Sequence, residues 1–321
     1  MPPVPLRGLR VYTSRMRLQS FTFLIPLALL SAAASQQAPP STEVYLATLD
    51  PAAGVTSWMN ISNSPGYDNQ PSFLPDSSAI LFSSNRDGKQ TDIYRYDIAG
   101  KTLKQLTNTP DSEYSPTVTP DGKTFSVIRQ AAADGTQLLV RYDLATGAHH
   151  SVVFENVKPV GYHAWIDATH VAMFILGSGQ GQPATLQIGD TTKGTAEIVA
   201  TGIGRSVLIR PRTKTVSFIS TAQPRMIKEF DLLTKATTDL IAPFENSQDA
   251  TWTPGGVLLM AADKTIAMWR TGRTEWATLA MISGDSPYVS GGAQPIVRSV
   301  TRMAVSADSK WMAFVAEPVA K

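Results

Sequence analysis

The chain repeats one short pattern of apolar and polar positions along most of its length. In its clearest copy, a β-rich run over residues 115–119 is followed by Pro120-Asp121-Gly122 and by a second β-rich run over residues 124–128. Proline and glycine supply the backbone angles of a tight turn, and short runs of β-branched and aromatic residues favour strands. The pattern therefore predicts a strand, a tight turn and a returning strand.

This unit recurs six times at intervals of 43 to 53 residues. Each copy places an apolar residue two positions before the turn proline or its equivalent: Phe73, Val118, Trp165, Ile209, Trp252 and Val305. A continuous apolar strand follows each one, and most copies then continue into an alternating strand that ends near Asp and a more polar outer strand. A period in the forties with about four short strands per unit is typical of a β-propeller. We predict an all-β fold, a six-bladed β-propeller, over residues 43–321.

The sixth unit ends close to Lys321 and lacks two strands. Residues 43–50 match the third-strand pattern and residues 55–61 match the fourth, and both precede the first complete unit. We expect these two amino-terminal strands to complete the last blade, because a closed ring hides the edges of its sheets.

The first 34 residues are typical of a secretory signal peptide. Four arginines precede an apolar run over residues 21–30, and small residues follow at 31–34. Translation would start at Met1 or Met16. We expect residues 35–42 to form a short linker and the mature protein to be periplasmic or secreted. The chain has no cysteine, which excludes disulfides and the usual bacterial lipid anchor, and no later apolar run is long enough to span a membrane.

Charge argues against a nucleic-acid partner. The whole chain carries a formal net charge of +2, and removing the four leader arginines leaves −2. A nucleic-acid or anionic-membrane binder needs a basic patch, which this balance does not favour.

Two stretches resemble a known family. Residues 69–76, 79–88 and 92–97 resemble the WD-like repeat of the TolB propeller, and residues 113–123 are a second good match. The resemblance covers residues 62–145 and implies a six-bladed propeller in the periplasm, where TolB belongs to the Tol-Pal envelope system. TolB carries an α/β domain ahead of its propeller, which we do not expect here. Similar propellers precede the catalytic domain of prolyl-oligopeptidase-like peptidases, but the sequence contains no Gly-x-Ser-x-Gly motif.

The sequence offers no clear metal or cofactor site. His149 and His150 are adjacent, so on a strand they would point to opposite faces, and we expect them in a surface turn. Residues 85–88 lack the spacing of a calcium loop and fit an Asp-Gly hairpin. The glycine-rich residues 177–183 match no nucleotide-binding motif and fit a flexible loop. We therefore predict no metal and no cofactor.

Candidate binding residues cluster where each innermost strand begins. These positions carry aromatic, amide and charged side chains suited to recognition of a partner at a channel mouth. They are Tyr67, Asp68, Glu113, Tyr114, Tyr162, His163, Arg205, Gln248, Asp249 and Arg302. The long turn-rich segment 283–295 lengthens the connection into the last unit and is a candidate cover for one channel mouth.

Two functions remain open from the sequence. The first is a non-enzymatic, monomeric propeller that binds a protein, peptide or glycan at the cell envelope or outside the cell. The second is a channel-centred hydrolase or lyase, with or without a metal, because propellers host both binders and enzymes.

Overall fold

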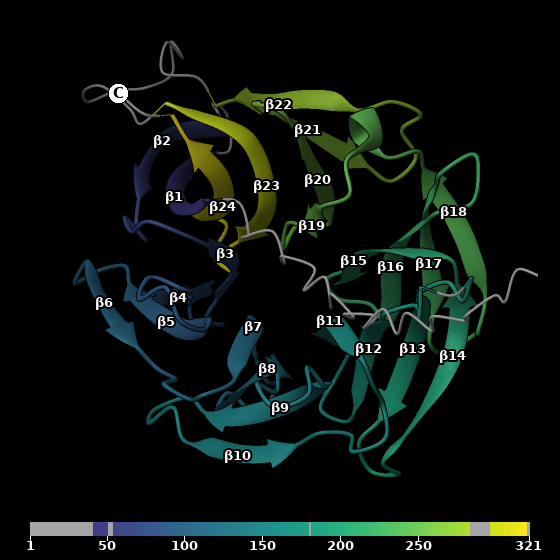
Figure 1. Cartoon of the computed structure of the whole chain (residues 1–321). Coiled ribbons are helices and arrows are strands. Elements are labelled where there is room, and N and C mark those ends of the chain that lie inside the picture. Colours follow the sequence, from purple (N-terminus) through teal and green to yellow (C-terminus); the bar gives the residue numbers. More distant parts are fainter. Residues whose placement is uncertain (1–40, 51–53, 180, 283–295, 320–321) are drawn as a thin grey trace, which may run out of the picture. The chain divides into compact units, whose positions relative to one another are not determined.

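A computed structural model describes residues 41–50, 54–179, 181–282 and 296–319. The predicted signal peptide, most of the predicted linker and the segment 283–295 lie outside the described residues. Figure 1 shows six four-stranded sheets arranged in a ring, each antiparallel throughout. The predicted all-β, six-bladed propeller is confirmed.

Five blades are built from consecutive strands. Blade 1 contains β3 (Asp68–Phe73), β4 (Ala79–Ser84), β5 (Asp92–Asp97) and β6 (Thr102–Gln105). Blade 2 contains β7 (Ser112–Val118), β8 (Thr124–Gln130), β9 (Gln137–Asp143) and β10 (His149–Val152). Blade 3 contains β11 (Val160–Trp165), β12 (His170–Ile175), β13 (Thr185–Asp190) and β14 (Thr195–Thr201). Blade 4 contains β15 (Ile203–Ile209), β16 (Thr215–Ser220), β17 (Ile227–Asp231) and β18 (Thr237–Ile241). Blade 5 follows the short helix η1 (Phe244–Asn246) and contains β19 (Ala250–Trp252), β20 (Val257–Ala262), β21 (Thr265–Arg270) and β22 (Ala277–Met281).

The sixth blade joins the two ends of the described chain. Its strand order is β2 (Gly54–Asn60), β1 (Glu43–Asp50), β24 (Trp311–Pro318) and β23 (Val297–Val305). Strand β1 pairs antiparallel with β24, with Tyr45 opposite Phe314, and the rings of these two residues stack at 5.3 Å between centroids. The predicted closure by amino-terminal strands is confirmed.

The core lies mainly between neighbouring blades. The second strand of each blade is covered on both faces, and β4 is buried at every position. Leu81 of β4 packs in one cluster with Phe125 and Val127 of β8, all three of them fully buried. Burying such a side chain contributes about 1.5 to 3 kcal/mol. This explains why the second strands are continuous apolar runs and not alternating ones.

The histidine pair differs from the prediction. His149 and His150 were expected in a turn, but they begin strand β10 at the outer edge of blade 2, where both are exposed. The preceding hairpin reverses at residues 144–147 because Gly147 adopts a φ of +74° and its N–H bonds the Asp143 carbonyl at 2.8 Å. The turn therefore ends before the histidines, and the prediction was wrong about their element.

No helix within the described part of the chain has the length and apolar character that crossing a bilayer requires.

Candidate binding site in the central channel

The innermost strands of all six blades line the central channel. Their residues enclose a cavity of about 150 Å³, and a wider cavity of about 800 Å³ adjoins it on the side of the turns that follow these strands. Pro71, Thr117, His163 and Val207 line both cavities, which are therefore successive parts of one channel. We call the smaller cavity the upper cavity and the larger one the funnel.

A charged network lines the upper cavity. Arg205 binds Asp249 through two nitrogens, with Nε–Oδ1 at 3.0 Å and Nη2–Oδ2 at 2.5 Å. Arg302 approaches the same carboxylate, with Nε 3.0 Å from Oδ1. Its Nη2 donates to the Tyr162 hydroxyl at 2.7 Å. Asp249 thus joins two guanidinium groups from blades 4 and 6.

Two further tyrosines adjoin this network. The rings of Tyr67 and Tyr114 meet edge to face at 6.4 Å between centroids. Burial raises the pKa of Tyr67 well above its usual range, although the charges of Arg302 and Arg205 oppose this shift, so its phenol stays neutral. These residues come from six different blades, with Tyr67 just ahead of β3 and Asp249 just ahead of β19: Tyr67, Tyr114, Tyr162, Arg205, Asp249 and Arg302. We call these six residues the collar.

The collar carries a surplus of positive charge. It contains two arginines and one aspartate. Burial alone lowers the pKa of Arg302, but Asp249 and Tyr162 more than offset this effect and raise it, so the guanidinium stays charged. Each guanidinium has five N–H donors, of which the contacts with Asp249 and Tyr162 use only part. The collar can therefore accept an anionic group and donate several hydrogen bonds to it.

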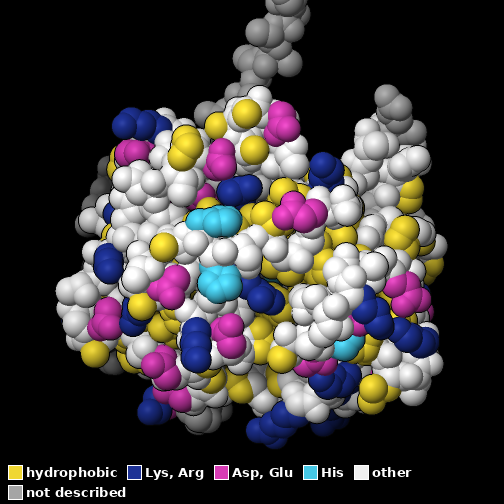
Figure 2. All heavy atoms as spheres, turned by 90° about the horizontal axis from the view of Figure 1, so that it is seen from below, with side chains coloured by type: hydrophobic (Ala, Val, Ile, Leu, Met, Phe, Trp, Pro, Cys, Tyr) yellow, Lys and Arg dark blue, Asp and Glu magenta, His cyan; other side chains and the backbone are white. Residues whose placement is uncertain are grey.

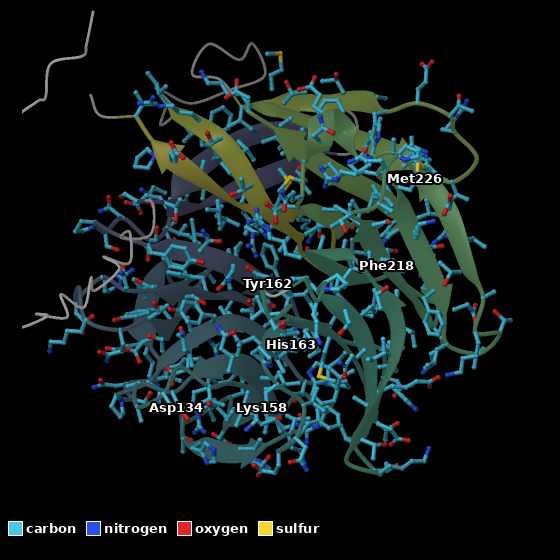
Figure 3. All side chains as sticks on the ribbon, turned by 45° about the vertical axis from the view of Figure 1, so that its right-hand side comes forward. Asp134, Lys158, Tyr162, His163, Phe218 and Met226 are labelled. Atoms are coloured by element: carbon cyan, nitrogen blue, oxygen red, sulfur yellow. The ribbon has the colours of Figure 1, made fainter. Side chains whose placement is uncertain are left out.

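His163 lies one residue further into the channel and is 93% buried. Figure 3 shows it with Tyr162 nearer the centre of the ring than Asp134 and Lys158. Its Nε2 lies 2.6 Å from Ser126 Oγ, and its Nδ1 has no hydrogen-bond partner among the described residues. Burial lowers the pKa of His163 to about 3, so the ring is neutral at physiological pH.

The spacing of His163 and Ser126 matches that of a catalytic base and nucleophile. Ser126 is, however, fully buried, and its Oγ already accepts a hydrogen bond from Trp165 Nε1 at 2.9 Å and donates to the Thr117 carbonyl at 3.2 Å. These contacts fix the position of the serine inside blade 2. We assign the pair a structural role.

Three innermost strands contain a kink at the same repeat position. Gln70, Ser115 and Arg302 each stand three residues before the aligned apolar residue, and their φ angles are 57°, 54° and 42°. Left-handed backbone at a residue other than glycine costs about 1 kcal/mol or more. Sheet register shifts at all three kinks, so side chains are redirected there. Gln70 and Ser115 are not among the binding residues predicted from the sequence, and only their repeat position could have indicated them.

Gln70 and Ser115 are also linked to each other. Gln70 Oε1 accepts hydrogen bonds from the Ser83 hydroxyl at 3.0 Å and from the Ser115 N–H at 2.9 Å, so it joins blades 1 and 2. The buried Ser115 Oγ has no hydrogen-bond partner among the described residues. Both residues line the upper cavity.

Asp68 was predicted beside Tyr67 in the binding surface, but its side chain is fully buried and contacts Ser64 and Arg86. The Ser64 hydroxyl donates to its Oδ2 at 2.8 Å, and Arg86 lies 3.6 Å from its Oδ1. Burial raises the pKa of Asp68 to about 6.

Glu113 was predicted beside Tyr114 and is also turned into the blades. Thr109, Thr107 and Tyr142 donate to its carboxyl oxygens at 2.5, 3.1 and 3.1 Å. Burial raises the pKa of Glu113 to about 7 and that of the neighbouring Asp92 as well.

Adjacent strand residues point to opposite sides, which explains why only one of each pair joins the collar. Gln248, the remaining predicted residue, is exposed ahead of β19. The structure therefore brings six of the ten predicted residues together in the collar. It places His163 just beyond them and the other three outside the network.

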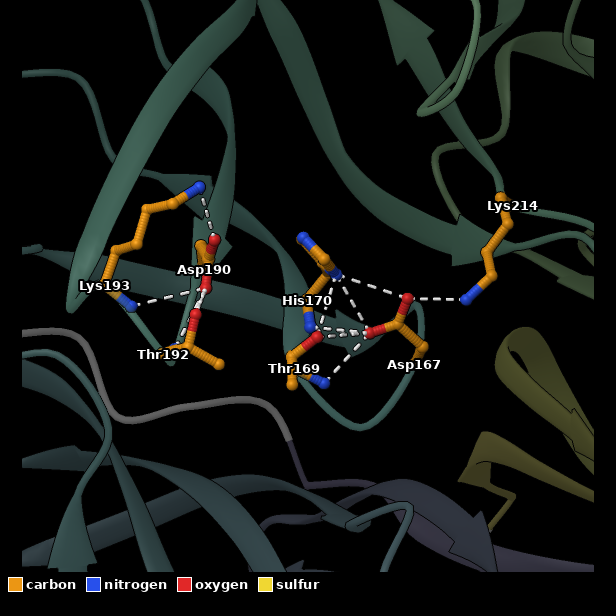
Figure 4. A network of polar contacts seen from close by, with 7 residues as sticks. All are labelled: Asp167, Thr169, His170, Asp190, Thr192, Lys193 and Lys214. Carbon is orange, nitrogen blue, oxygen red and sulfur yellow. Dashed lines mark hydrogen bonds and ion pairs between the residues drawn. The ribbon is translucent and has the colours of Figure 1, made fainter.

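A separate polar network lies away from the collar, near the turns of blades 3 and 4 (Figure 4). Lys214 of blade 4 reaches Asp167 of blade 3 at 2.5 Å, and Asp167 also accepts from the His170 N–H at 2.8 Å.

Figure 2 shows Lys and Arg side chains interspersed with Asp and Glu over the face that it presents. Within residues 41–50, 54–179, 181–282 and 296–319, no group of three His, Cys, Asp or Glu residues could hold a metal ion.

Solved structures confirm the likeness of the fold to TolB propellers. No protein-family model and no curated protein sequence matches the chain. A protein assigned as TolB from Agrobacterium tumefaciens shares 15% sequence identity, with a TM-score of 0.64 over 88% of this chain and 100% of its own.

Two enzymes have a similar architecture. A gluconolactonase from Xanthomonas campestris matches with 9% identity and a TM-score of 0.57, over 88% of this chain and 99% of its own. An oligogalacturonate lyase in complex with manganese matches with 14% identity and a TM-score of 0.56, over 82% and 80%. At these identities the likeness establishes the fold alone.

Proposed function

We propose that the protein is an exported, non-enzymatic propeller that captures a protein, peptide or glycan partner through its collar. The observation that carries the proposal is the convergence of three tyrosines, two arginines and one aspartate from six blades at one position in the channel. Tyrosine and arginine dominate recognition surfaces because they combine large contact areas with hydrogen-bond donors.

Export rests on the sequence. The basic, apolar and small-residue segments of residues 1–34 have the order of a secretory leader. The resemblance of residues 62–145 to the repeat of periplasmic TolB agrees with a location at the cell envelope. We propose that the mature chain acts in the periplasm or outside the cell.

A pull-down with two collar variants tests the proposal. The bait is the chain from residue 35, presented to envelope and culture-medium fractions. Tyr114→Leu removes the hydroxyl and ring contact while keeping an apolar side chain, and Tyr162→Phe removes the acceptor for Arg302. Leu233→Ala is the control because Leu233 is 77% exposed on a turn of blade 4.

We expect both collar variants to lose capture of a partner that the wild type and the control retain, while both remain folded at the temperature of the pull-down, as melting curves would show. Equal capture by all four proteins would contradict the proposal. Loss of capture only in variants that have unfolded at the temperature of the pull-down would contradict it as well, because the collar would then act only through folding.

The second candidate is a channel-centred hydrolase or lyase, which the same fold supports in the gluconolactonase and the oligogalacturonate lyase. Turnover of a lactone or an acidic oligosaccharide by the wild type, lost in Tyr162→Phe and kept in Leu233→Ala, would favour this candidate over the binding propeller.

A further inference from the structure

We infer that the collar binds the free carboxylate of a peptide carboxy terminus, with the terminal side chains in the funnel. This inference rests on the proposed function and names the ligand class of the same site. Four features of the channel support it: the charge surplus, unsatisfied polar atoms, free strand edges and an apolar ring.

The charge surplus selects a single anionic group. Asp249 neutralises one of the two guanidinium groups, and the collar keeps a formal charge of +1. Arg302 is 17% exposed at its side chain, so water screens this charge only partly. A half-buried unbalanced charge is costly, and one carboxylate would balance it. Planar guanidinium groups also match the geometry of a carboxylate.

Two polar atoms of the upper cavity lack partners among the described residues. They are His163 Nδ1 and Ser115 Oγ, both inaccessible to solvent. Buried polar atoms are normally hydrogen-bonded, and exceptions call for an explanation. Both residues line the upper cavity, so a small rotation of each side chain would present its polar atom to a ligand with donor and acceptor groups, such as the last peptide unit of a chain.

The innermost strands offer backbone pairing to an extended chain. Each of β3, β7, β11, β15, β19 and β23 is the last strand of its sheet, so one edge has no partner strand among the described residues. Only some backbone groups on these edges are occupied, among them the N–H groups of Asp68, Ser115 and Ala250, which bond Thr42, Gln70 and Ser206. These edges line both cavities. Unused strand edges bind extended peptides through main-chain hydrogen bonds. A saccharide cannot make this repeated pairing, and the edges therefore favour a peptide.

The funnel supplies an apolar environment next to the collar. The six aligned apolar residues line it, one from each blade: Phe73, Val118, Trp165, Ile209, Trp252 and Val305. Its volume of about 800 Å³ is within the range of ligand sites, about 300 to 1,000 Å³. The residues that gave the sequence its repeat thus form a ring that suits an apolar carboxy-terminal side chain.

Four probes test the inference by calorimetric titration of the chain from residue 35. They are N-acetyl-Ala-Ala-Phe with a free carboxylate, the same peptide as its carboxamide, N-acetyl-Ala-Ala-Ser with a free carboxylate, and digalacturonate. We expect the first to bind tightest. The carboxamide should bind about tenfold to a hundredfold more weakly, because hydrogen bonds to a charged group are lost. The serine peptide should bind more weakly than the phenylalanine peptide because the funnel is apolar.

Two variants locate the effect. Arg302→Gln removes the surplus charge and leaves Arg205 paired with Asp249, and Arg270→Gln removes an exposed arginine on β21. We expect Arg302→Gln to reduce the acid-to-amide preference to about threefold or less and Arg270→Gln to leave it unchanged. Melting curves show whether each variant is folded. Should Arg302→Gln unfold, the preference for acid over amide in the wild type still decides the inference.

Three results would overturn it. The first is equal affinity for the acid and the amide, and the second is binding of none of the three peptides. The third is binding of digalacturonate alone, lost in Arg302→Gln, which would identify an acidic glycan as the ligand. In each case the pull-down with Tyr114→Leu and Tyr162→Phe still decides the proposed binding function separately.

Discussion

Replacing Glu113 by glutamine is expected to remove a large part of the pH dependence of stability that arises between blades 1 and 2. In the folded protein burial raises the pKa of Glu113 from 4.5 to about 7. Its carboxyl group also hydrogen-bonds Asp92, whose pKa burial raises too. The two buried carboxyl groups are therefore most stable when they hold a proton between them.

The sign follows from proton binding in the two states. Between pH 4.5 and 7 the folded protein retains a proton on Glu113 that the unfolded chain has released. The stabilisation is fully present below pH 4.5 and is lost as the pH rises through 7. A pKa that moves from 4.5 to about 7 corresponds to about 3 kcal/mol of unfolding free energy.

Glutamine can replace the protonated carboxyl group without a lost partner. Its carbonyl oxygen can accept from Thr109 and Tyr142 as Oε1 does, and its amide nitrogen can donate to Asp92 at every pH. The Thr107 hydroxyl, which donates to Oε2, can turn to Asp92 Oδ1, 3.4 Å away. We expect a small change in stability at pH 4.5.

Urea unfolding at several pH values from 4.5 to 8.5 measures the effect. Relative to its value at pH 4.5, the wild type should lose about 3 kcal/mol more than Glu113→Gln by pH 8. Glu197→Gln, an exposed change on β14, should follow the wild type. His163 titrates in the opposite sense, losing stabilisation below pH 6.5, but it is present in all three proteins and cancels. Parallel curves for the wild type and Glu113→Gln would refute the assigned role of burial.

Two predictions concern backbone positions. At Gly147 a Cβ atom would lie 1.8 Å from the Leu106 carbonyl oxygen, so Gly147→Ala should cost about 4 kcal/mol or more. Gly122→Ala, with a similar φ of +67° but open space, should cost about 1 to 2 kcal/mol in the same urea unfolding assay. Similar losses of unfolding free energy in the two variants would contradict the close contact between Gly147 of blade 2 and the Leu106 carbonyl of blade 1. Ser115→Gly should raise the melting temperature, because glycine accepts a φ of 54°, and it should weaken partner capture. The control Ser72→Gly, on the innermost strand of blade 1, should lower the melting temperature. A lower melting temperature for Ser115→Gly would show that the kink stores no strain.

The strands could be predicted from the sequence because their signals are local. Residues 43–50 were predicted as a strand with the bounds that β1 has. Alternating apolar positions and Asp or Gly turns act over a few residues, so a single chain contains them. Ring closure followed from counting strands and from the cost of an open edge. The bounds of β10 were harder to predict because a hairpin can shorten by a residue or two without changing its composition.

The collar could be predicted in part because a repeat fixes the register. Arg205 and Asp249 stand 44 residues apart, and no local pattern connects them, yet the aligned apolar residues place both at the channel. Which member of a neighbouring pair faces the channel depends on strand alternation and on the kinks, which the sequence does not show. Asp68 and Glu113 were therefore grouped with Tyr67 and Tyr114, although their carboxyl groups lie inside the blades.

The kinks themselves connect the fold with the candidate function. A regular innermost strand would alternate its side chains between the two neighbouring blades and present mainly its edge to the channel. Left-handed φ angles at Gln70, Ser115 and Arg302 interrupt this alternation at one level of the ring and shift the register there. Packing does not require this, because the residues at the same repeat position in blades 3, 4 and 5 have no left-handed φ; they are Tyr162, Ser206 and Asp249. Strain that recurs at one level of a channel, beside polar atoms without partners, is what a binding site would maintain and a purely structural ring would not.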